Sequence, residues 1–295
     1  DQSSLQRLRA WALSPWALAI LLGGICILGL GSGAMSLSPL EVLAALLQGA
    51  GLDPLALGLG AVSPSARAVV GGLRAPRVLP GACGGGTLAL SGAALQGLFR
   101  NPLADPQLLG MSMGGAVGAA LVILVGAEVL PLAFEEWGNL IIPFGAFAGS
   151  LITVVLVLSI ASQGGRSSTA NILLAGIAFN ALGGAALGLL LFFSDEAALR
   201  TITMWTLGSL GGATWGGLKV ALPLMLLAGA LCLREASALN ALLLGEADAS
   251  YLGINASQVE RRVTVAVALA VGAGVALSGV IGFVGLVVPH LYRLV

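Results

Sequence analysis

Long apolar runs, separated by short polar or glycine-rich stretches, dominate the chain. Several runs reach the roughly 20 residues that a helix needs to cross a hydrocarbon layer of about 30 Å. They lack the period-two alternation of barrel strands, so the pattern predicts helices. We expect membrane spans at residues 14–34, 74–99, 107–126, 140–162, 170–193, 216–233 and 263–282, and an eighth that starts near residue 286.

The composition supports the same prediction. Of the 295 residues, 58% are hydrophobic and 9% are charged, whereas about a quarter of the residues of a soluble domain are charged. No soluble core buries so large an apolar fraction, so the bilayer is the expected solvent. The sequence therefore predicts an all-α fold, a polytopic transmembrane helical bundle with about seven to eight spans in one domain over residues 1–295.

The distribution of basic residues weakly favours a cytoplasmic N-terminus under the positive-inside rule. Residues 35–73 are then external, and residues 234–262 form the largest internal connection. The polar stretch Gly245–Arg262 is the main water-facing surface on the internal side. We expect a soluble partner to dock there.

Glycines recur at four-residue spacing inside the expected spans, which places them on one helix face. Such rows let helix backbones approach closely in lipid, where no hydrophobic force draws helices together. We therefore expect tight helix packing at Gly81 with Gly85, at Gly110 with Gly114 and Gly118, at Gly145 with Gly149, and at Gly184 with Gly188.

Several chemistries have no support in the sequence. The formal net charge is zero and no basic stripe stands out, which argues against a nucleic-acid partner. No GxxxxGK[ST] phosphate loop surrounds the only lysine, Lys219. One histidine, His290, cannot form a metal cluster, no GxSxG motif is present, and Cys26, Cys83 and Cys232 lie in apolar runs as packing residues. The chain is therefore not expected to be an enzyme, to bind a metal or to hold a cofactor.

Charges are scarce inside the expected spans, where proton-coupled or ion-coupled carriers need them. This scarcity disfavours a secondary transporter that works alone, although that reading and a membrane-embedded enzyme stay as alternatives. The driving force of any transport is then expected to come from another protein.

Four ordered motifs carry a specific resemblance. Arg74-Ala-Pro-Arg77 precedes the long motif Ser91–Gly110, which includes Arg100-Asn101-Pro-Leu-Ala-Asp105-Pro; Leu243–Gly253 and Gly279–His290 follow. Together they resemble the FecCD/BtuC-type permease subunits of type II ABC importers, which take up iron complexes, haem and vitamin B12. The resemblance covers essentially the whole chain.

The resemblance implies an architecture and a set of partners. Such permeases have ten spans per subunit, pair with a second copy of themselves around a central path, and lie in the bacterial inner membrane. Two cytoplasmic ATP-binding subunits hydrolyse ATP-Mg, and a periplasmic substrate-binding protein delivers the cargo. Because the sequence stops at Val295 within an apolar run, we expect the last two or three spans to be absent from it.

Arg74 and Arg77 match the external arginines that receive glutamates of the binding protein. Their i, i+3 spacing places both on one helix face, and guanidinium forks suit carboxylates. Simple anchoring of the span end at the interface is the alternative. Arg200 is a possible substrate contact, because a guanidinium pairs with a haem propionate, or else a snorkelling residue at a span end.

Asn101, Pro102 and Leu103 match the loop that helps to close the cytoplasmic gate, and Thr169 matches a further gate residue. The Asn-Pro pair is also a helix stop. The resemblance assigns coupling to the ATPase to short helices in the polar connection, at Leu244, Gly245, Glu246, Ala249, Leu252 and Gly253. A bare polar connector is the alternative there.

The cargo is the most detailed prediction. The pattern from Phe179 to Leu210, with Asn180, Ser194-Asp195-Glu196 and Arg200, is more similar to haem permeases than to cobalamin permeases. Haem is therefore the expected cargo, and a ferric siderophore and cobalamin stay open. His290 follows a proline that permeases without haem share, so we expect a structural hydrogen bond there rather than iron ligation. Transport by alternating access is the expected mechanism.

Overall fold

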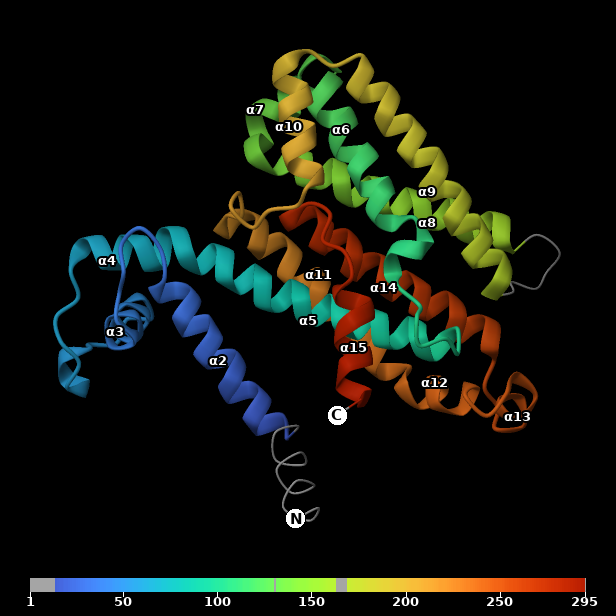
Figure 1. Ribbon diagram of the computed structural model, residues 1–295, viewed down its shortest axis with the longest axis horizontal. Coiled ribbons are helices and arrows are strands. Elements are labelled where there is room, and N and C mark those ends of the chain that lie inside the picture. Colours follow the sequence, from blue (N-terminus) through green and yellow to red (C-terminus); the bar gives the residue numbers. More distant parts are fainter. Residues whose placement is uncertain (1–13, 130, 163–168, 295) are drawn as a thin grey trace.

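The structure, a computed structural model, describes residues 14–129, 131–162 and 169–294. Within these ranges all regular structure is helical (Figure 1), as the sequence predicts. The helices are α2 Pro15–Gly31, α3 Pro39–Gly49, α4 Pro64–Ala68, α5 Ala75–Leu98, α6 Met111–Val129, α7 Pro131–Trp137, α8 Ile141–Ala161, α9 Thr169–Phe192, α10 Glu196–Thr206, α11 Trp215–Arg234, α12 Ala236–Leu242, α13 Glu246–Tyr251, α14 Ala256–Ser278 and α15 Val284–Leu294. Short 3-10 turns lie at Leu55–Leu57, Pro106–Leu109 (η3) and Gly138–Leu140, and a π-helical turn, η2, covers Val69–Arg74.

Among the described residues, five helices are long and apolar enough to cross a membrane: the continuous helix Pro64–Leu98, α8, α9, α11 and α14. The expected spans at 14–34 and 107–126 correspond to the shorter apolar helices Pro15–Gly31 and Met111–Gly126. α2 has 17 residues, which corresponds to a length of about 26 Å. α15 covers 11 residues near the expected eighth span.

The bounds predicted for the seventh span, 263–282, are wrong at both ends. α14 begins at Ala256, where the side chain of Asn255 accepts a hydrogen bond from the Gln258 N–H at 3.1 Å. The charged residues that follow are therefore helical and not part of a loop. The helix ends at Ser278, because Gly279 and Phe283 both have positive φ, at 69° and 66°, and the chain turns there before α15.

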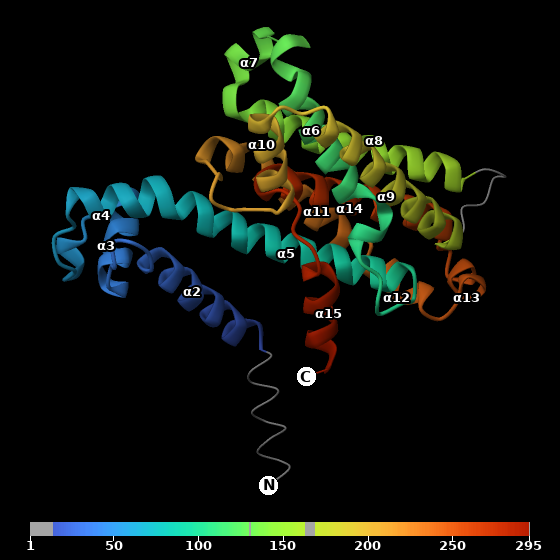
Figure 2. The same cartoon turned by 45° about the horizontal axis from the view of Figure 1, so that its top comes forward.

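α5 crosses the centre of the bundle and packs against α14, α11 and α15 (Figures 1 and 2). α14 is the most buried long helix and separates α5 from the group formed by α6, α8 and α9. The main hydrophobic core is built from alanine, valine and leucine side chains of these helices. In a bilayer the outward leucine, valine and phenylalanine side chains face lipid, which explains their exposure here.

The glycine rows differ in how closely other helices approach them. A Cβ at Gly118 would lie 2.2 Å from the Gly145 carbonyl oxygen, and one at Gly149 would lie 2.2 Å from that of Gly114. The backbones of α6 and α8 therefore touch, which confirms the predicted packing at these rows. A Cβ at Gly184 would meet no atom within 4 Å, and the same is true of Gly85 and Gly188, so the described residues show no tight packing at these three positions.

The expected external segment 35–73 is more ordered than its composition indicates. α3 begins with a capping box in which Ser38 and Glu41 bond each other's backbone N–H groups. These hydrogen bonds lower the pKa of Glu41, since they favour its ionised form. The π-helical turn η2 leads into α5, and the Trp215 indole of α11 donates a hydrogen bond to the Gly71 carbonyl at 2.8 Å. This bond ties the segment to the bundle.

Candidate functional site

The two arginines at the start of α5 have different surroundings. Arg74 is half-buried and donates from Nη1 to the Leu30 carbonyl at 2.7 Å and from Nη2 to the Met35 carbonyl. Gly33, with φ of 146°, lies flat against the guanidinium, since a Cβ there would be 2.8 Å from Nη2. Arg74 thus stabilises the C-terminal end of α2 through these hydrogen bonds, whereas Arg77 is exposed. Of the predicted docking pair, Arg77 presents the freer guanidinium to a partner's carboxylate.

The hydrogen bonds of Arg74 predict an effect on the thermal stability of the chain. Arg74→Gln is expected to lower the free energy of unfolding by about 2 kcal/mol, because two backbone carbonyls lose a charged donor. The corresponding fall in Tm is about 5 °C in detergent. Arg77→Gln is the matched control and is expected to leave Tm unchanged. Equal melting temperatures for the two variants would contradict the stabilising role of Arg74.

The predicted gate residues form a tight turn after α5. Arg100 adopts φ of 49°, a left-handed conformation that ends the helix. The side chain of Asn101 accepts a hydrogen bond from the Leu103 N–H at 2.9 Å, and its backbone N–H donates to the Gln96 carbonyl at 3.2 Å. Asn101, Pro102 and Leu103 are exposed at the tip. The Asn-Pro pair is therefore a helix stop, as expected, and it also presents an exposed turn.

After this turn the chain folds back into the bundle. Asn180 of α9 donates from Nδ2 to the Gln107 carbonyl at 2.9 Å, and a Cβ at Gly176 would lie 2.2 Å from the Leu108 carbonyl oxygen. η3 is thus held against the middle of α9. The turn at Asn101 is consequently anchored to a span that reaches the opposite side.

Asp105 begins η3 by accepting a hydrogen bond from the Gln107 N–H at 2.7 Å. Burial raises the pKa of this carboxyl, and the Gln107 hydrogen bond opposes the shift. A raised pKa in the folded state means that the folded chain binds the proton more tightly, so stability is lost as the pH rises from acid to neutral.

Asp105→Asn keeps the capping oxygen and removes the charge. We expect this variant to melt about 1–2 °C above the wild type at pH 7.5, and the gain to shrink as the pH is lowered, because the wild-type carboxyl then takes up its proton. Paired thermal melts at the two pH values check this. A gain that is larger at pH 4 would contradict the sign of the shift.

Thr169 is the first residue of α9 and is half-buried. The described hydrogen bonds do not join it to the turn at Asn101. Arg200 is exposed on α10, which Asp195 caps by accepting from the Ala198 N–H at 2.7 Å. The structure therefore places these two predicted residues on α9 and α10, and no described hydrogen bond links either of them to the turn at Asn101.

The predicted coupling residues gather around α12 and α13, beside the end of α5 (Figure 1). Gly245 and Gly253 have φ of 127° and 79°, conformations that favour glycine, and they bound α13. Ala249 is buried, whereas Leu244 and Leu252 are 68% and 65% exposed. Two exposed leucines therefore flank this short helix, one on each side, and offer apolar contacts suited to a groove on another protein.

An ion pair links the predicted coupling segment to the turn at Asn101. Arg100 Nη2 lies 3.7 Å from Glu246 Oε1, and both side chains are substantially exposed. An exposed pair of this kind contributes at most about 1 kcal/mol to stability. The contact shows that the predicted gate turn and the predicted coupling helix lie side by side.

Two polar contacts escaped the sequence reasoning. Gln96, only 3% exposed, accepts a hydrogen bond from Arg293 Nη1 at 2.7 Å. Glu235, buried between α11 and α12, pairs with Arg262 at 3.4 Å. A polar residue inside an apolar run is a usable signal for Gln96. The sequence carries no such signal for Glu235, because this residue follows the end of a span, where charged residues are common.

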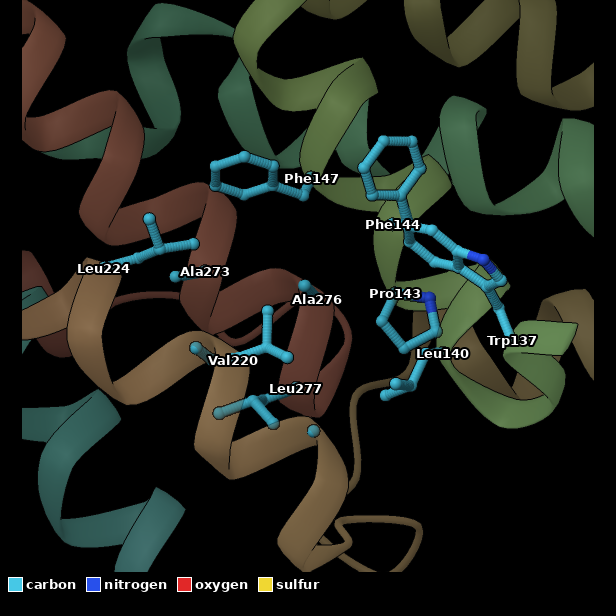
Figure 3. Close-up of a pocket in the computed structure, with 12 residues that line it drawn as sticks. Trp137, Leu140, Pro143, Phe144, Phe147, Val220, Leu224, Ala273, Ala276 and Leu277 are labelled. Carbon is cyan, nitrogen blue, oxygen red and sulfur yellow. The ribbon is translucent and has the colours of Figure 1, made fainter. Parts of the chain in front are cut away.

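An apolar cavity of about 220 Å³ opens between α8, α11 and α14 (Figure 3). Trp137 and Phe144 meet edge to face at one wall, with ring centroids 5.7 Å apart. The remaining wall comes from residues such as Phe147, Leu224 and Ala273. The cavity offers no ionisable side chain, so it suits hydrocarbon and not a metal complex held by ligands.

No group of three or more His, Cys, Asp or Glu residues that could hold a metal ion lies in the described part of the chain. His290 is half-buried on α15, directly after Pro289. The cysteines Cys26, Cys83 and Cys232 are free.

Residues 19–295 match the FecCD transport family. The chain belongs to the FecCD transport family. The match includes the gate turn, the coupling segment and α15, and so confirms the resemblance on which their assignment rests.

Individual relatives agree with this family. The chain is 47% identical over 222 residues to the hemin transport system permease protein HmuU of Yersinia pestis, which covers 75% of this chain and 65% of the relative. It is 39% identical over 234 residues to the cobalamin import system permease protein BtuC of Halobacterium salinarum, covering 79% and 61%. The chain thus spans less than two thirds of the length of these relatives.

A solved structure shares the fold. The inward-facing conformation of a metal-chelate type ABC transporter superposes with a TM-score of 0.78 at 30% identity, over 95% of this FecCD chain and 80% of the other. The helical bundle described above is therefore the fold of an ABC transporter permease.

Proposed function

We propose that this chain is the permease subunit of an ATP-driven importer of the bacterial inner membrane and that its cargo is haem. The observation that carries the cargo is the 47% identity with the hemin permease HmuU, against 39% with BtuC of Halobacterium salinarum. Family membership and the shared fold support the importer itself. ATP-Mg is bound and hydrolysed by a partner, and the chain binds no cofactor of its own.

The proposed assembly contains a second copy of this chain, two cytoplasmic ATP-binding subunits and a periplasmic binding protein. Arg77 receives an acidic side chain of the binding protein, and α13 seats on the ATPase through Leu244 and Leu252. ATP binding displaces α13, and Glu246 transmits that movement through Arg100 to the turn at Asn101. Access then alternates between the two sides of the membrane.

The cargo is tested by reconstituting the chain with its ATPase and binding protein in proteoliposomes. Haem is expected to stimulate ATP hydrolysis and to enter the vesicles, whereas a ferric siderophore and cobalamin are not. Stimulation by cobalamin alone would overturn the haem assignment in favour of the function of the BtuC relatives. Uptake by vesicles that hold only this chain would overturn the importer and favour a secondary transporter.

Arg200→Gln is the companion variant. Weaker haem-stimulated ATP hydrolysis is expected for it if Arg200 pairs with a haem propionate.

A further inference from the structure

The connection between α11 and α14 is closed at its base by an ion pair. Arg262 Nη1 of α14 lies 3.4 Å from Glu235 Oε1, and 27 positions along the chain separate the two residues. Glu235 ends α11 and begins α12, with φ of −85° and ψ of 0°. The pair therefore joins the beginning and the end of the segment that carries the predicted coupling helix α13 (Figure 1).

The two charges of this pair have unequal surroundings. Glu235 is only 7% exposed, whereas the side chain of Arg262 is 57% exposed. Arg262 also donates from Nη2 to Gln258 Oε1 at 3.5 Å, one turn earlier on α14, which orients the guanidinium from its own helix. A buried carboxylate loses its hydration, and apolar residues in place of such a pair are often as stabilising or more so. Stability of the fold therefore does not by itself account for an acid at this position.

The segment between the two charges depends on how its ends are held. Leu239 and Leu242 of α12 are buried in the same core cluster as Val259 and Val263 of α14, so α12 is seated on the bundle. α13 has a single buried residue, Ala249. The packing of α13 on the bundle is thin, and its position is therefore set by α12 and by the base of the segment.

We propose that Glu235 and Arg262 form a clasp, which keeps the base of the segment closed so that a force on α13 moves α11 and α14 together. α14 is the most buried of the long helices, and a displacement of its first turns reaches the centre of the bundle. The pair between Arg100 and Glu246 leads instead to α5. The clasp itself rests on the ion pair alone, whereas its part in transport rests on the function proposed above.

The first experiment measures amide hydrogen exchange in residues 236–254 of the purified chain in nanodiscs, without the ATPase or cargo. Arg262→Gln is expected to raise the exchange rates there about tenfold, because the base of the segment opens locally. Arg261→Gln is the matched control, since it removes a neighbouring exposed charge that forms no ion pair with another described residue. Wild-type exchange rates are expected for this control. Equal rates in the two variants would overturn the clasp.

Glu235→Gln separates the clasp from a general loss of stability. The amide keeps the shape of the side chain and leaves no buried charge without a partner, so Tm is expected to stay close to wild type. Exchange in residues 236–254 is nevertheless expected to rise, because the attraction to Arg262 is lost. Unchanged exchange in Glu235→Gln would show that Arg262 acts through other contacts and would also overturn the clasp.

The second experiment tests the part of the clasp in transport, in proteoliposomes with the ATPase and the binding protein. Arg262→Gln is expected to deliver about fivefold less haem per ATP hydrolysed, while the ATPase still co-purifies. Arg262→Lys keeps the charge and is expected to restore most of this ratio. A wild-type ratio in Arg262→Gln would overturn the transmission through α11 and α14. Absence of haem uptake by the wild type would overturn the proposed cargo, and the exchange rates would still decide the clasp.

Discussion

Gly92→Ala is expected to destabilise the chain by about 3 kcal/mol, because the added methyl group overpacks a helix contact. A Cβ at Gly92 would lie 1.7 Å from the carbonyl oxygen of Gly285 and 2.4 Å from its carbon, and both atoms belong to backbone. That carbonyl has no helical partner, because the residue four positions later is Pro289, which lacks an N–H. α15 therefore packs directly on the α5 backbone and would be forced off it.

Thermal melts in detergent measure this effect, and a fall of about 10 °C is expected. Gly85→Ala on the same helix is the matched control, since a Cβ at Gly85 meets no atom within 4 Å. Alanine there is expected to be neutral or to stabilise the helix by up to about 1 kcal/mol. Similar melting temperatures for the two variants would show that α15 does not pack on α5 as described.

Leu244→Asp/Leu252→Asp is expected to produce the largest functional loss. Both leucines are mostly exposed, at 68% and 65%, so the charges should leave Tm of the isolated chain unchanged. If α13 seats in an apolar groove of the ATPase, two buried carboxylates would weaken the complex by more than about a hundredfold. Co-purification of the ATPase and haem-stimulated ATP hydrolysis are the measurements.

Leu57→Asp is the control for this variant, because Leu57 is 61% exposed in the segment expected on the opposite side of the membrane. It is expected to retain the ATPase fully. Normal association and hydrolysis in the double variant would contradict the coupling role of α13, whereas a lower Tm would show that the leucines contribute to the fold.

The candidate site was predictable as far as local sequence could specify it. The Asn101-Pro102 pair was predicted as a helix stop from the local sequence, whereas Gly245 and Gly253 were assigned only through the family resemblance. The start of α14 was misplaced, although Asn255 is a capping residue, because the charged turn that follows it looks like a loop by composition. Charge in the first turns of a span is compatible with a helix that begins outside the hydrocarbon layer.

The sequence by itself determined that this protein is a bundle of membrane helices in the FecCD family, since run length, polarity and ordered motifs lie along the chain. Only the tertiary structure decided what individual polar groups contact. Arg74 and Arg77 look equivalent at i, i+3, yet Arg74 reaches the carbonyls at the end of α2. Gln96 meets Arg293, 197 positions away. In a bilayer each buried polar group must find a partner, and that partner is chosen by how distant helices pack.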